Sequence, residues 1–274
     1  MPTRRDFVMT SLMTGFTLAV TRAESAPIHT DSTGLVAGEI RVHTLQGEIP
    51  AYRAQPDRDG TFPIILVIEE IFGVHEYIKD VCRRLAKLGY MAIAPELYAR
   101  QGDLSKMTDP HEIVEKIILK APDDRLLNDI DSTVTWAIAN RGDTGRLGIM
   151  GFCRGGRDTW LYAEHNPYLK AAVAFYGPVT GPTSPIQPKT PLDLARELKC
   201  PLLGLYGGAD ESISEADLRH AQALAKSAGQ TVQLEIFPNA PHGFHADYRA
   251  TYRKDAAEAA WSKAIDWFHK YGVA

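Results

Sequence analysis

Hydrophobic and polar positions predict an alternation of strands and helices from about residue 36 to the C-terminus. Short, nearly continuous apolar runs, which are typical of strands buried on both faces, occupy residues 63–68, 91–95, 147–150, 171–175, 201–206 and 232–237. Between them, apolar residues recur at helical spacing, and helices are expected at residues 77–88, 110–119, 123–140, 155–164, 214–228 and about 250–271. This alternation favours an α/β fold, a mostly parallel sheet with helices on both faces.

The start of the fold has a different pattern. Residues 39–45 alternate between apolar and polar side chains, which predicts a half-exposed strand. Residues 49–54 are expected to pair with it as an antiparallel hairpin, and Pro50 favours an edge position because proline donates no ladder hydrogen bond. Residues 178–191 contain five prolines, so we expect an irregular loop there. No linker divides the chain, and we expect one domain from residue 27 to 274.

Composition narrows the functional classes. The chain has 274 residues, of which 45% are hydrophobic, and a formal net charge of −4. These proportions exclude a disordered chain, and no basic block points to nucleic acid. Three cysteines are too few for a disulfide scaffold. Cys82 and Cys200 are expected in the core, and a bond between them stays open.

The first 26 residues predict an export signal. Arg4-Arg5 precedes a weakly apolar stretch at about residues 8–20, which small residues follow. The arginine pair favours a twin-arginine (Tat) signal and a periplasmic location, with an ordinary Sec leader as the alternative. About 13 apolar residues are too few to span a hydrocarbon core of about 30 Å, so no stable membrane anchor is expected.

The strongest chemical motif is Gly151-Phe-Cys153-Arg-Gly155-Gly156, which follows a short apolar strand and opens a predicted helix. A sharp strand-to-helix turn that lifts a nucleophile above a sheet is a nucleophile elbow. Such a turn needs tiny residues two before and two after the nucleophile. It also places the Cys153 thiol at a helix N-terminus, where the thiolate is favoured.

A base and an acid follow in the order expected after an elbow. Asp210 and His242 each come just past a strand end, so they should reach the same rim of the sheet as Cys153. Glu211 is the rival acid and His245 the rival base. No third ligand cluster accompanies the two histidines, and no metal site is predicted.

The segment after the first buried strand completes the predicted machinery. Backbone N–H groups of Ile71 and Arg154 are the expected pair of oxyanion-hole donors. Glu69 and Glu70 stand at the same rim. One of these carboxylates could couple to the thiol and modulate its ionisation.

Together these motifs resemble the dienelactone hydrolase family of α/β-hydrolases. The resemblance runs from about residue 36 to 271 and is carried by residues 69–73, 94–100, 151–156, 207–210 and 242–244. It implies an α/β-hydrolase fold, a triad of Cys153, Asp210 and His242, and no metal or organic cofactor. It also implies that Glu70, which directly precedes Ile-Phe-Gly, interacts with the thiol and couples its ionisation to substrate arrival.

The chain departs from the family in its basic residues. Family members that act on dienelactone hold the substrate carboxylate with two arginines, one of them a few residues past the catalytic histidine. Ala246 occupies that region here, with Arg249 slightly later. The other arginine falls in the segment 111–120, where only Lys116 or Lys120 is basic. These departures weigh against dienelactone itself as the substrate.

The predicted function is hydrolysis of small esters or lactones through a thioester on Cys153, by a monomer or small homo-oligomer. Tyr98, Arg100 and Lys116 are the expected substrate contacts. Two other classes stay open. The missing arginines favour a non-catalytic binding protein on a hydrolase scaffold, and an exported reactive cysteine favours a thiol redox sensor.

Overall fold

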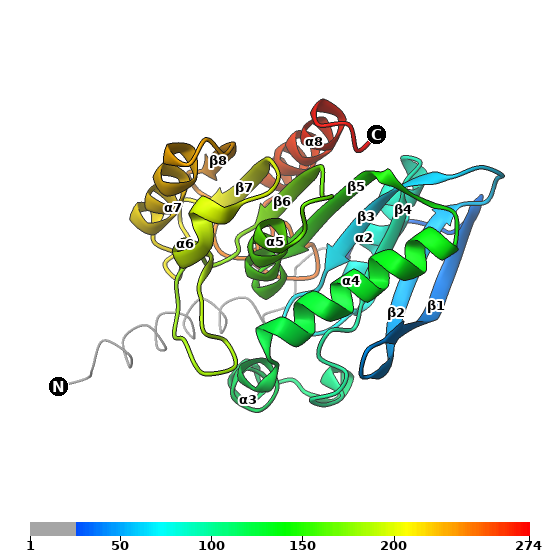
Figure 1. Ribbon diagram of the computed structural model, residues 1–274, viewed down its shortest axis with the longest axis horizontal. Helices are drawn as coiled ribbons and strands as arrows, with labels where there is room; N and C mark the ends of the chain where they lie inside the picture. The colour runs from blue at the N-terminus through cyan, green and yellow to red at the C-terminus, as the bar shows by residue number, and fades with distance from the viewer. Residues whose placement is uncertain (1–25) are drawn as a thin grey trace.

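Eight strands form one sheet in the computed structural model, which describes residues 26–274 (Figure 1). The strand order is β1-β2-β4-β3-β5-β6-β7-β8. Strand β2 runs antiparallel to both of its neighbours, and all other neighbouring strands are parallel. The strands are β1 (Leu35–Thr44), β2 (Gly47–Pro56), β3 (Phe62–Ile68), β4 (Met91–Pro95), β5 (Gly142–Phe152), β6 (Ala171–Phe175), β7 (Leu202–Gly207) and β8 (Val232–Phe237). The predicted export signal lies outside the described residues, apart from Ala26.

Helices cover both faces of this sheet. They are α2 (Glu76–Lys87), α3 (Pro110–Lys116), α4 (Asp123–Ala139), α5 (Arg154–His165), α6 (Pro191–Leu194), α7 (Glu215–Ser227) and α8 (Lys254–Lys270). Apolar side chains of α2 and α8 share one hydrophobic layer, whereas those of α4, α5 and α7 share the other. In Figure 1, α4 and α5 cover the face toward the viewer. Among the described residues, none of these helices combines the length and apolarity that a bilayer crossing requires.

Strand β3 shows why the central strands read as continuous apolar runs. Ile64 and Leu66 belong to the layer of α4 and α5, while Ile65 and Val67 belong to the layer of α2 and α8. Successive side chains of a strand point to opposite faces, so a strand covered on both sides needs apolar residues at every position. Burying each such side chain stabilises the fold by about 1.5–3 kcal/mol.

The structure confirms the predicted strands and helices and corrects three details. The sheet edge is β1, and Pro50 lies on the inner strand β2. Proline is tolerated there because the β2–β4 ladder begins at Ala51, just beyond the missing N–H. The helix expected at 110–119 ends at Lys116 and continues as a 3₁₀ turn. The last helix begins at Lys254, because the chain before it folds into turns.

The two other cysteines are free and buried. Cys82 lies in the layer of α2 and α8, and Cys200 lies in the layer of α4, α5 and α7. The sheet separates the two thiols, so the disulfide left open by the sequence does not form. Burial raises the pKa of both thiols, for Cys200 to about 12, which makes them unreactive.

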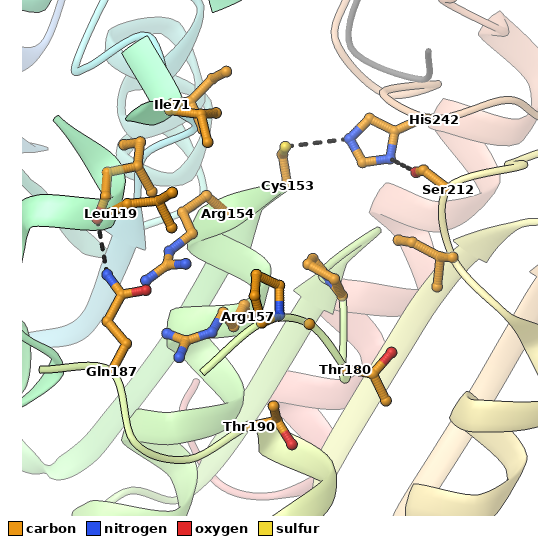
Figure 2. A pocket seen from close by; sticks show the side chains of 16 residues that line it. Ile71, Leu119, Cys153, Arg154, Arg157, Thr180, Gln187, Thr190, Ser212 and His242 are labelled. Carbon is orange, nitrogen blue, oxygen red and sulfur yellow. Dashed lines mark hydrogen bonds between the residues drawn. The ribbon is translucent and has the colours of Figure 1, made fainter. Parts of the chain in front are cut away.

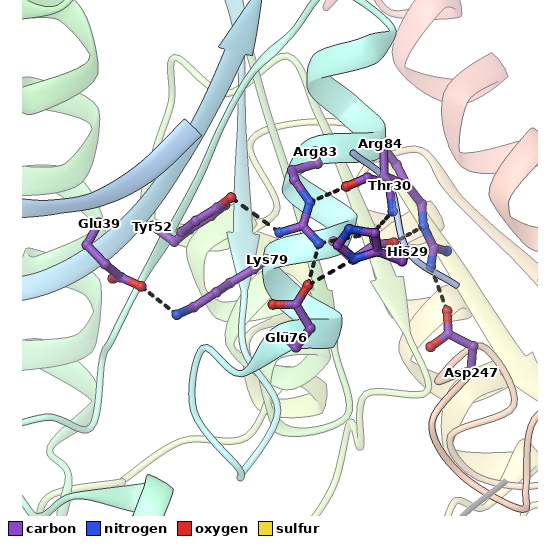
Figure 3. A network of polar contacts seen from close by, with 10 residues as sticks. His29, Thr30, Glu39, Tyr52, Glu76, Lys79, Arg83, Arg84 and Asp247 are labelled. Carbon is purple, nitrogen blue, oxygen red and sulfur yellow. Dashed lines mark hydrogen bonds and ion pairs between the residues drawn. The ribbon is translucent and has the colours of Figure 1, made fainter. Parts of the chain in front are cut away.

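The start of the described chain is fixed against α2 by a polar network (Figure 3). The Thr30 N–H donates to Asp80 at 2.5 Å, and the Arg83 side chain donates to the Thr30 carbonyl at 2.6 Å. Arg84, on the same helix, pairs with Asp247 at 2.6 Å. The network therefore joins the N-terminal segment and α2 to the loop between β8 and α8.

Candidate active site

Cys153 is the single residue between β5 and α5, and its backbone is strained. Its φ of +55° lies in the left-handed region that favours glycine. The Cys153 N–H donates to the Phe175 carbonyl of β6 at 3.0 Å, which fixes the turn to the sheet. A Cβ atom at Gly151 would lie 2.1 Å from the Gly155 carbonyl oxygen, and one at Gly155 would lie 2.4 Å from the Ile68 oxygen. Both glycines are therefore required by the elbow.

The structure brings Cys153, His242 and Asp210 into one chain of contacts. His242 Nε2 lies 3.2 Å from Cys153 Sγ, and His242 Nδ1 lies 2.7 Å from Asp210 Oδ2. All three residues are buried. Ser212, which the sequence reasoning missed, donates its hydroxyl to Asp210 Oδ1 at 2.5 Å and approaches His242 Nδ1 at 3.5 Å (Figure 2). An Asp-x-Ser turn is the local signal for such a contact.

The two loops that carry the acid and the base are held against each other. Asp210 follows β7 and His242 follows β8, and the parallel register of these strands puts both loops at one end of the sheet. The Ala209 N–H donates to the Ala240 carbonyl at 3.0 Å. A Cβ atom at Gly207 would lie 2.1 Å from that same carbonyl oxygen. The close approach of the loops therefore depends on glycine at the end of β7.

Electrostatics favour the charged form of the imidazole. Burial alone would lower the pKa of His242, but Asp210 and Cys153 outweigh it and raise that pKa to about 10. Burial also opposes ionisation of Asp210, and His242 nevertheless holds the pKa of this carboxyl below its ordinary value. These contacts therefore favour an imidazolium at His242, whose Nε2 faces the Cys153 sulfur at 3.2 Å.

The rival acid and base lie elsewhere. Glu211 is exposed. His245 is buried, and its Nδ1 lies 2.7 Å from the Tyr77 hydroxyl. Burial, together with the nearby Arg84 charge, lowers the pKa of His245 to about 3, so this ring is neutral.

The predicted oxyanion-hole residues border the same cavity. Ile71 follows β3, whose end is paired with the end of β5 next to the elbow. Arg154 is the first residue of α5, where a helix leaves its N–H groups without an intrahelical partner. Donors of this kind suit the negative oxygen of a tetrahedral intermediate.

Glu70 is held by groups other than the thiol. Arg249 lies 3.0 Å from Glu70 Oε1, the Tyr248 hydroxyl donates to Oε2 at 2.7 Å, and His75 lies 3.5 Å away. Burial opposes ionisation, but Arg249 and His75 outweigh it and lower the pKa of Glu70 to about 2. The hydrogen bond found for the Cys153 sulfur among the described residues is to His242 rather than to Glu70.

Glu69 is a separate structural carboxyl. It accepts the Leu97 N–H at 2.7 Å and is fully buried. Burial, with the neighbouring Glu96 carboxylate, raises its pKa well above the ordinary value. Glu69 therefore joins the segment after β3 to the segment after β4.

A cavity opens beside Cys153 and His242 (Figure 2). Its wall includes Arg154 and Arg157, and the expected contacts Tyr98, Arg100 and Lys116 are not part of it. Each of these three side chains contacts a carboxylate that is not part of the cavity wall. Those partners are Asp158 for Tyr98, Asp129 for Arg100 and Glu112 for Lys116. Within residues 26–274, no group of three potential ligand side chains could hold a metal ion.

The sheet, the elbow and the three aligned side chains define an α/β-hydrolase fold with cysteine at the nucleophile position. The chain belongs to the dienelactone hydrolase family, whose model matches residues 49–272. It is 53% identical over 273 residues to a Methylorubrum extorquens protein named "Putative carboxymethylenebutenolidase", covering 99% of this chain and 94% of that protein. An Escherichia coli K12 protein of the same name is 44% identical over 264 residues, covering 96% and 97%.

A solved structure is similar throughout. The "Putative Dienelactone Hydrolase" of Klebsiella pneumoniae superposes with a TM-score of 0.85 at 46% identity, covering 86% of this chain and 99% of that one.

Proposed function

We propose that the protein hydrolyses small esters or lactones through a thioester on Cys153. The observation that carries this proposal is the alignment of Sγ, the imidazole and the Asp210 carboxylate at 3.2 and 2.7 Å. The names of the relatives point to a lactone as one candidate substrate. Acyl transfer fits the site because Cys153, His242 and the two residues expected to supply backbone donors, Ile71 and Arg154, line one cavity.

The first half of the reaction forms the thioester. The Cys153 thiolate attacks the carbonyl carbon, and the carbonyl oxygen becomes an oxyanion that the N–H groups of Ile71 and Arg154 stabilise. The intermediate then collapses, and the bond from carbon to the leaving oxygen breaks. The His242 imidazolium donates its proton to that oxygen as it departs.

The second half restores the enzyme. Neutral His242 now accepts a proton from water, and the resulting hydroxide attacks the thioester carbonyl. The second oxyanion accepts hydrogen bonds from the same N–H groups of Ile71 and Arg154. It collapses to release the carboxylic acid and the Cys153 thiolate, while Asp210 holds the imidazole in the required orientation.

Turnover by variants tests the proposal. We expect wild type and Cys82→Ala to hydrolyse p-nitrophenyl acetate and a simple lactone at rates within about threefold of each other, because Cys82 is a buried core residue that does not line the cavity. Cys153→Ala should lose at least about a thousandfold in kcat/KM. Equal rates for wild type and Cys153→Ala would defeat the proposal.

A further inference from the structure

We propose that the cavity selects esters and lactones whose acyl part is apolar and uncharged, and that it disfavours acyl groups carrying a carboxylate. The inference rests on the proposed function and names its substrate class. Two independent features of the cavity carry it: the chemistry of its wall and the state of every cation beside it.

The wall of the cavity is largely hydrocarbon. Side chains from four segments far apart in the sequence contribute to it: Ile71, Val114, Ile118, Leu119, Pro178 and Ile213. The part that comes from residues 114–119 is held in place by Gln187. This buried side chain donates to the carbonyls of Ile118 and Ala121, both at 2.8 Å, and so ties the proline-rich loop to that segment (Figure 2). These apolar side chains offer a carboxylate no hydrogen-bond donor, and the hydroxyls of Thr180, Thr190 and Ser212 in the same wall are uncharged.

The two arginines at the cavity are already paired. Arg157 donates to both oxygens of Asp123, each at 2.9 Å, and to Asp158 at 3.0 Å. Arg154 lies 3.3 Å from Asp158 and 3.5 Å from Asp123. The two guanidinium groups therefore face two buried carboxylates, and this cluster has no net charge. A bidentate contact of this kind is among the strongest that arginine makes.

The third arginine near the sulfur is likewise neutralised, since Arg249 pairs with Glu70. The His242 imidazolium is balanced by Asp210. In the proposed reaction Cys153 attacks as a thiolate, so the sulfur carries negative charge when the acyl group is seated beside it. A second negative charge on the acyl group would approach this thiolate in a partly desolvated site, where charges repel more strongly than in water.

A matched pair of substrates tests the inference on the wild-type protein. p-Nitrophenyl methyl adipate and p-nitrophenyl hydrogen adipate share a leaving group and a chain, and they differ by one carboxylate charge. We expect kcat/KM for the methyl ester to exceed that for the acid by about tenfold or more. A smaller preference, or a preference for the acid, would overturn the inference. Turnover of p-nitrophenyl acetate reports separately on the proposed function, so the two failures can be told apart.

Variants locate the effect. Asp123→Asn removes the bidentate partner of Arg157, so the preference for the methyl ester should shrink by about tenfold. Glu112→Gln is the control, because Glu112 is the exposed partner of Lys116 and lies outside the cavity wall. It should leave the preference unchanged. Should Asp123→Asn not fold, Arg154→Gln removes a cation instead and must widen the preference. A change in the opposite direction for either variant contradicts the assignment.

Discussion

The buried pair of Glu70 and Arg249 lies beside the nucleophile without a hydrogen bond to it. Sequence resemblance predicts that Glu70 interacts with the thiol, and the structure shows it held by Arg249 and Tyr248. The charge of Arg249 nevertheless acts on Cys153, since the sulfur contributes to raising the pKa of this arginine. Glu70 can therefore influence the thiol through the arginine that it neutralises.

A Glu70→Gln variant tests that influence. Removing the carboxylate leaves the Arg249 charge unbalanced near Sγ, which favours the thiolate. The pH profile of Cys153 alkylation by iodoacetamide should shift to lower pH, and the protein should lose about 3 kcal/mol of stability. Glu211→Gln, at an exposed position, is the control. An unshifted profile for Glu70→Gln would remove Glu70 from the mechanism.

The raised pKa of His242 makes the free energy of unfolding depend on pH. The pKa of His242 rises from 6.5 to about 10 on folding, so its protonation stabilises the folded state fully below about pH 6.5. This contribution declines as the pH rises toward 10. Asp210 acts in the opposite direction: its lowered pKa contributes stability that is lost only in acid.

Urea unfolding of wild type and His242→Gln measures this contribution. We expect the difference in the free energy of unfolding to be largest between about pH 5 and pH 6.5 and to shrink steadily toward about pH 9.5. His43→Gln is a suitable control because the His43 side chain is 85% exposed. A difference that stayed constant with pH would show that the ion pair between His242 and Asp210 does not form.

At the scale of elements, the elbow joins β5 to α5 through a turn whose backbone segments are in close contact at Gly151 and Gly155. Gly151→Ala would put a methyl group 2.1 Å from the Gly155 carbonyl oxygen, and the backbone would have to move. We expect a loss of about 3 kcal/mol or more in the free energy of unfolding, and loss of esterase activity in whatever folds. Gly38→Ala meets no atom within 4 Å and should cost less than about 1 kcal/mol. Similar midpoints of urea unfolding for Gly151→Ala and Gly38→Ala would contradict the close packing of the elbow.

The elements that the sequence predicted well are those whose pattern reflects one physical cause. Strands buried on both faces must be apolar throughout, and the elbow glycines are required by contact distances of 2.1 and 2.4 Å. The order Cys153, Asp210, His242 follows from strands that end at a common edge. These features depend on local chemistry and topology.

Other features depend on partners that a pattern does not reveal. Tyr98 and Arg100 suggested substrate contacts, but each is bound by a carboxylate from another segment. Lys116 pairs instead with Glu112, one turn earlier on α3. Arg157 borders the cavity only because α5 turns it toward Asp123. Long-range pairing decided the positions of Tyr98, Arg100 and Arg157, and a local pattern does not reveal it. The i, i+4 spacing of Glu112 and Lys116, in contrast, is a local signal that the sequence does contain.

At the scale of the whole molecule, the site is assembled from the ends of β3, β5, β7 and β8, and the polar network at Thr30 fixes the start of the described chain against α2. The residues before this segment carry the proposed export signal. We propose that the chain reaches the periplasm through the twin-arginine route. This would deliver a protein that has already folded around its free thiols.

Cell fractionation tests the route. Changing Arg4 and Arg5 together to lysine keeps the charge and should hold the protein in the cytoplasm, whereas the unaltered chain should be found in the periplasm. Arg22→Lys is the matched control and should be exported normally. Periplasmic accumulation of the double variant would argue for a Sec leader instead.

The central claim is that the Cys153 sulfur carries the acyl group during turnover. The most direct measurement is rapid acid quenching of the wild-type protein with p-nitrophenyl acetate, followed by mass spectrometry of its peptides. We expect one acetyl group on the peptide that contains Cys153, formed with the burst of nitrophenol and absent from Cys153→Ala. Turnover with no acyl group on that peptide, or with the group on another residue, would contradict it.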